Sequence, residues 1–98
     1  MSHTIKIGLV TIELHLEGVS SLKEKRGRIK SLTTRLQKQF NVSVAEVGYH
    51  DVWQSSAIAV ATVTNSSALA DQMIANVLKW IEHNYPDAEI VDEVIEIL

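Results

Sequence analysis

The basic side chains of this chain gather in one short stretch, where their type and spacing suit contact with anionic groups. Seven of the nine lysines and arginines fall between positions 23 and 38: Lys23, Lys25, Arg26, Arg28, Lys30, Arg35 and Lys38. Such side chains bind RNA phosphates or acidic protein surfaces. A solvated helix face is the simpler interpretation, because long cations are mostly exposed. The candidate contacts with RNA or with a protein partner are Lys23, Lys25, Arg26 and Arg28.

The segment His50–Gln54 is the second stretch whose residue types suit recognition. Trp53 can stack on an unpaired base or anchor a partner chain, and Trp53 and Gln54 join the candidate contacts. Tryptophan is more often largely buried than exposed. We therefore expect Trp53 to pack against apolar surface, either in its own core or in a second subunit, and not to stand free as a stacking platform.

A metal or small-ligand site is a further alternative. Glu13 and His15 share one face of a strand, about 7 Å apart, and His50 with Asp51 could add ligands, yet no spacing matches a known metal pattern. The chain has no cysteine, no nucleophile-elbow motif and no glycine-rich phosphate loop. We assign no catalytic, cofactor or metal residue, and we expect a protein that is not an enzyme.

Size and composition indicate a single domain over residues 1–98. A hydrophobic content of 46% and a charged content of 21% are ordinary for a globular protein. The net charge is −3, and half of the twelve acids lie near the C-terminus: Glu82, Asp87, Glu89, Asp92, Glu93 and Glu96. The first residues run straight into a strand pattern without a leader signature, and no apolar run approaches the ~20 residues of a membrane span. We expect a cytoplasmic protein.

Alternating apolar residues predict strands at 5–16, 42–49, 57–64 and 88–98. Ser21 followed by Glu24 is a capping box that opens a helix ending at Asn41. A second helix begins at 65–67 and ends before Pro86. The predicted core stripe of the first helix is Leu22, Ile29, Leu32, Leu36 and Phe40. That of the second helix is Leu69, Met73, Val77, Trp80 and Ile81.

This order of elements, βαββαβ, predicts an α+β ferredoxin-like fold, with a four-stranded antiparallel sheet and two helices on one of its faces. The last strand nevertheless carries apolar residues on both faces: Ile90, Val94 and Leu98 on one, and Val91, Ile95 and Ile97 on the other. An uncovered apolar surface tends to mark an association site. We therefore expect self-association through the open face of the sheet.

Four segments of the chain are specific when taken together: VTIELHL at 10–16, SLKEKR at 21–26, FNVSVAEV at 40–47 and DVWQ at 51–54. In these segments the chain resembles the YlxP family of bacterial proteins of unknown function, and the resemblance covers nearly the whole chain. Gly48-Tyr49-His50 stands where many members have an Asp-His-Gln-like triplet, so no role is carried over to these positions. The resemblance implies a small ferredoxin-like domain. In some bacteria the family's genes neighbour those for translation initiation and ribosome maturation.

These observations support three hypotheses for the function. The first is a non-enzymatic interaction domain, homodimeric, acting in ribosome assembly or translation. The second is an RNA-binding module that uses the basic first helix. The third is a small-ligand or metal-binding regulatory domain.

Overall fold

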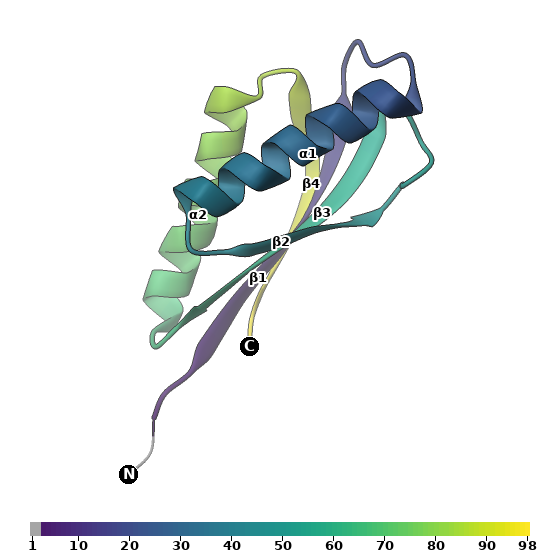
Figure 1. The fold of residues 1–98 in the computed structure, drawn as a ribbon. Helices are drawn as coiled ribbons and strands as arrows, with labels where there is room; N and C mark the ends of the chain where they lie inside the picture. Colours follow the sequence, from purple (N-terminus) through teal and green to yellow (C-terminus); the bar gives the residue numbers. More distant parts are fainter. Residues whose placement is uncertain (1–2) are drawn as a thin grey trace.

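The computed structural model describes residues 3–98, so Met1 and Ser2 of the expected domain lie outside the described residues. The elements are β1 (Lys6–Leu16), α1 (Leu22–Gln39), β2 (Ser43–Gly48), β3 (Ser55–Thr64), α2 (Ser67–Asn84) and β4 (Ala88–Ile97). The strands form one antiparallel sheet in the order β2-β3-β1-β4. Both helices lie on one side of it (Figure 1). The predicted ferredoxin-like fold is confirmed.

The core lies between the sheet and the helices. The even-numbered apolar residues of the central strand β1 face this layer, and Val10, Ile12 and Leu14 have no exposed surface. Helix α1 covers them with Ile29, Leu32 and Leu36, which are buried as the helical spacing predicts. Neither α1 nor α2 is long and apolar enough to cross a membrane.

Helix α2 buries part of its predicted stripe. Val77 and Ile81 are buried as predicted, and Trp80 packs against the core. In the first half of the helix the buried residues are Ala70 and Ile74, whereas Leu69 of the predicted stripe is 52% exposed. The cause is a close approach over Gly8 of β1, where an added Cβ would stand 3.1 Å from the Cβ of Ala70. A small side chain fits this contact and a leucine does not.

Strand β4 carries a bulge that the alternation in the sequence did not predict. The register between β1 and β4 shifts at Glu13/Leu14, so Ile90 lies opposite Leu14 on the helix side while Val94 lies opposite Thr11 on the other side. The prediction that Ile90, Val94 and Leu98 share one face is therefore wrong. An inserted residue reverses the alternation of side chains on either side of it.

Candidate functional site

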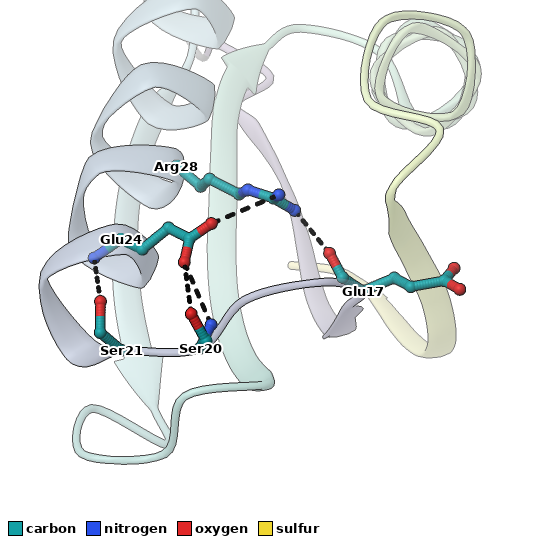
Figure 2. Close-up of polar contacts among 5 residues, drawn as sticks. All are labelled: Glu17, Ser20, Ser21, Glu24 and Arg28. Atoms are coloured by element: carbon teal, nitrogen blue, oxygen red, sulfur yellow. Dashed lines mark hydrogen bonds and ion pairs between the residues drawn. The ribbon is translucent and has the colours of Figure 1, made fainter.

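Helix α1 begins in a network of polar contacts (Figure 2). The Ser21 hydroxyl accepts a hydrogen bond from the backbone N–H of Glu24 at 3.1 Å, and the Glu24 carboxylate accepts one from the backbone N–H of Ser20 at 3.1 Å. The predicted cap at Ser21 is confirmed, with Glu24 reaching one residue further back than a capping box requires. Arg28 donates to the carbonyl oxygen of Glu17 at 2.8 Å and lies 3.9 Å from Glu24. These contacts tie the helix to the loop before it.

Lys25 of α1 points into the protein and is only 1% exposed. Its Nζ lies 3.2 Å from the carboxylate of Glu46 on β2, and it donates a hydrogen bond to the carbonyl oxygen of Tyr49. The buried hydroxyl of Ser56 donates to the same carboxylate at 2.5 Å. A buried charge is stable when it is paired and hydrogen-bonded in this way. The structure therefore removes Lys25 from the residues available to RNA or to a partner.

The positions of Lys25 and Glu46 in the sequence indicate this ion pair, although it was not predicted above. Lys25 follows Leu22 by three residues and precedes Ile29 by four, which places it on the core stripe of α1. Glu46 follows Val44 by two residues, which places it on the core side of β2. A lysine and a glutamate at core positions of neighbouring elements indicate a buried ion pair.

Tyr49 fixes the loop between β2 and β3. Its φ of 59° is a left-handed conformation that bulky residues rarely adopt. On the helix side of the sheet, Lys25 donates a hydrogen bond to the carbonyl oxygen of Tyr49. On the other side, the hydroxyl of Tyr49 donates to Glu13 at 2.9 Å. The hydrogen bond to the Glu13 carboxylate, together with its negative charge, raises the pKa of Tyr49. A residue in a strained conformation persists where contacts over-determine it.

Trp53 is half exposed in this loop, at 50%, and its neighbour Val52 is 45% exposed. The expectation that Trp53 packs in its own core is wrong, and contact with a second subunit stays a prediction. Gln54 is exposed, and its carbonyl oxygen accepts a hydrogen bond from the backbone N–H of Leu16 at 2.8 Å. This bond draws the chain into the sheet early, so β3 begins at Ser55 and not at position 57.

We expect Trp53→Ala to lower the melting temperature much less than Trp80→Ala. Trp80 packs against Phe40, Tyr85 and Arg35, with centroid distances of 5.1–6.3 Å. Its truncation should cost about 3 kcal/mol, against about 1 kcal/mol for the half-exposed Trp53. These are the two tryptophans of the chain, so thermal melts of the two variants compare the same substitution at two positions. Equal losses of stability would show that Trp53 is enclosed after all.

The other basic residues of α1 differ in what their side chains contact. Arg28 and Arg35 are committed to internal contacts, since Arg35 lies over Trp80 and donates to the Tyr85 hydroxyl at 3.1 Å. Arg28 also lines a hollow of about 470 Å³ between α1 and the α2–β4 turn.

Lys23, Arg26 and Lys30 are exposed and follow one another at i+3 and i+4 spacing on α1; we call them the basic stripe. Within residues 3–98 their side chains take part in none of the hydrogen bonds or ion pairs. The start of α1 lies at the same end of the molecule as the 49–54 loop (Figure 1). We call this end, with the first turn of α1 and the loop 49–54, the Trp53 end.

The face of the sheet without helices, the open face, is apolar toward its other end. Ile7 lies opposite Val63 of β3 and exchanges two backbone hydrogen bonds with Leu98. These three side chains are 37%, 68% and 62% exposed. We call residues that lie opposite one another on neighbouring strands a row. The next row along the open face consists of Leu9, Ala61 and Glu96, and the row after it of Thr11, Ala59 and Val94. Polar residues complete the face toward the Trp53 end: Glu13, His15, Glu89 and Asp92.

The four residues suggested for a metal or ligand site are not gathered in one place. Glu13 is bound to Tyr49, and Nε2 of His50 lies 3.3 Å from the carbonyl oxygen of Glu46. In the part of the chain that the structure describes, no three histidine, aspartate or glutamate side chains are grouped closely enough to hold a metal ion.

Comparisons with known proteins point to a family without an assigned role. A family model described as "Protein of unknown function (DUF503)" matches residues 7–95. The chain is 37% identical over 83 residues to the "Uncharacterized protein YlxP" of Bacillus subtilis (strain 168), covering 85% of this chain and 89% of that protein. Among solved structures it is similar to the "De novo designed protein Foldit4", with a TM-score of 0.54, 13% identity and 96% of each chain covered. That similarity concerns the fold alone.

Proposed function

The chain belongs to the DUF503 family, whose function is unknown, and we propose that it is a non-enzymatic interaction domain that pairs with a second copy of itself through the open face. Its buried polar side chains support a binding role over a catalytic one. Lys25, Glu46 and Ser56 satisfy one another inside the protein. The features left for function are surfaces.

The row of Val63, Ile7 and Leu98 is the observation that carries this proposal. Three neighbouring strands present large apolar side chains side by side, with no helix over them. Leu9 and the alanines of β3 extend the row toward the middle of the sheet. A contiguous apolar patch of this kind is uncommon on a monomer and marks a site of association.

The area of the open face meets the requirement of a small stable dimer. With strands ~4.8 Å apart and residues ~3.3 Å apart, each strand residue covers about 16 Å² of the sheet. The 11, 6, 10 and 10 residues of β1 to β4 therefore give a face of about 600 Å². Two such faces bury about 1,200 Å² together, which lies at the lower limit of stable protein interfaces. The estimate predicts a dimer that dissociates on dilution.

Light scattering on the wild-type protein tests this proposal. The average molar mass should rise from that of one chain toward that of two as the concentration increases into the high micromolar range. Dissociation at low concentration follows from the small interface. A strict monomer throughout this range would contradict the proposal.

RNA binding is a second candidate function, and the exposure of Trp53 favours it. An exposed aromatic side chain and a line of cations are the features with which proteins hold single-stranded RNA, with bases stacked and phosphates paired. The first turn of α1, where the basic stripe begins with Lys23, lies at the same end of the molecule as the 49–54 loop that contains Trp53. RNA of the ribosome would be the natural ligand if the protein acts in ribosome assembly or translation.

Salt dependence tests this second function. A short single-stranded oligouridylate should bind the wild type, and the triple variant Lys23→Gln, Arg26→Gln, Lys30→Gln should bind more weakly. Three lost phosphate contacts should reduce the slope of log K against log salt by about 2. The triple variant Lys6→Gln, Lys38→Gln, Lys79→Gln removes the same charge elsewhere and should keep the wild-type slope. Equal effects of the two variants would reject the basic stripe as the site.

A further inference from the structure

In its middle rows, the open face is divided lengthwise into a bulky half and a small half. The strands β1 and β4 carry large side chains there, with Leu9 on β1 and Val94 on β4. The strands β3 and β2 carry small ones in the same rows: Ala59 and Ala61 on β3, and Ser43 and Ala45 on β2. The end row, with Ile7 beside Val63, is large on both strands. The boundary between the halves runs between β1 and β3, along the middle of the sheet.

We infer that two copies pair with their two-fold axis parallel to the strands, so that β1 of one copy lies on β3 of the other; this inference rests on the proposed function. Such an axis exchanges the two halves of the face and keeps every residue at its own level along the strand. In the middle rows large side chains then meet small ones, which favours close packing, and in the end row Ile7 faces Val63 of the second copy. Leu9 faces Ala61 of the second copy, and Val94 faces Ala45 of the second copy.

The charges of the open face favour the same arrangement. With the axis parallel to the strands, Glu96 faces Ser43 of the second copy, and Glu13, bound to Tyr49 of its own chain, lies at the level of Ala57 of the second copy, so no two acids meet. An axis perpendicular to the strands through Thr11, the middle residue of β1, would instead place like strands on each other. The register then sets Leu9 against Glu13 and Asp92 against Glu96. The apolar side chain of Leu9 would then be buried against the carboxylate of Glu13, and the two negative charges of Asp92 and Glu96 would be buried together.

This arrangement brings the two Trp53 ends to the same end of the dimer. The 49–54 loop and the β3–α2 turn lie at opposite ends of the sheet (Figure 1). In the parallel arrangement each feature lies beside its copy, about 14 Å away for sheets ~10 Å apart and a displacement of two ~4.8 Å strand spacings. In the perpendicular arrangement, copies of either feature are separated by at least the length of a strand, about 33 Å.

Distances between spin labels on single cysteines test the arrangement. The chain has no cysteine of its own, so Asp51→Cys and Asn65→Cys each place one label per chain on an exposed position at either end. Pulsed electron resonance on each dimer should give a short distance for both variants, near 14 Å plus the lengths of the label arms. Distances beyond about 33 Å for both would reject the parallel axis while leaving the dimer intact. A protein that light scattering shows to be monomeric would instead overturn the proposed function itself.

Discussion

Lys25→Met should lower the melting temperature of this protein by roughly 12–24 °C. The substitution keeps the apolar stem but removes the charge that pairs with Glu46 and the donor to Tyr49. Removing one partner of a buried ion pair costs about 3–5 kcal/mol, and the 19% exposure of the Glu46 side chain favours the lower value. At about 4–8 °C per kcal/mol for a domain of this size, 3 kcal/mol gives the stated shift. Thermal and urea melts measure it.

Two comparison variants separate the ion pair from general effects of the substitution. Arg26→Met lies one residue along the same helix on an exposed position, and it should change stability by less than about 0.5 kcal/mol. The double variant Lys25→Met, Glu46→Leu should recover part of the loss, because apolar replacement of a whole buried pair is often neutral. A Lys25→Met protein that melts like Arg26→Met would show that the pair contributes nothing.

Val63→Lys should weaken self-association about 100-fold without unfolding the chain. Val63 is 68% exposed in the single chain, so a lysine there is solvated in the monomer. In the dimer each of two lysines would be buried against apolar side chains of the other copy, a costly desolvation. A 100-fold loss corresponds to about 2.7 kcal/mol. Sedimentation velocity over a dilution series gives the dissociation constants.

Leu69→Lys is the matched control for Val63→Lys. Leu69 is also a large apolar residue, 52% exposed, but it lies on α2 and not on the open face. The control should associate like the wild type. Equal weakening by both substitutions would reject the open face as the interface, as would unchanged association of Val63→Lys.

Local patterns in the sequence were sufficient to predict the fold. The alternation along β1 and the spacing of Ile29, Leu32 and Leu36 on α1 predict the two sides of the core, since each depends only on the period of its own element. The first half of the predicted face of α2 was wrong because it depends on Gly8, a residue of another element, whereas Val77 and Ile81 are buried as predicted. The side chains of β4 were misassigned because a bulge has no reliable signature in an alternating strand.

The candidate site was less predictable, because it depends on contacts between elements. A run of cations on α1 could not show by composition that Lys25 is buried while Lys23 and Arg26 are exposed. The position of Lys25 on the core stripe carried that information, and Glu46 supplied its partner. Trp53 is half exposed in the loop that begins at Tyr49, whose backbone is left-handed. No residue-type rule gives that conformation for a tyrosine.

Methyl resonances of the wild-type protein, followed by carbon–proton NMR over a dilution series, test most directly that this chain pairs through its open face. The methyl signals of Ile7, Val63 and Val94 should shift or broaden as the concentration rises, because the second copy covers them. Those of Thr34 on α1 and Ala75 on α2, which are exposed on the helices, should stay unchanged. Spectra that do not depend on concentration, or changes confined to Thr34 and Ala75, would contradict the account.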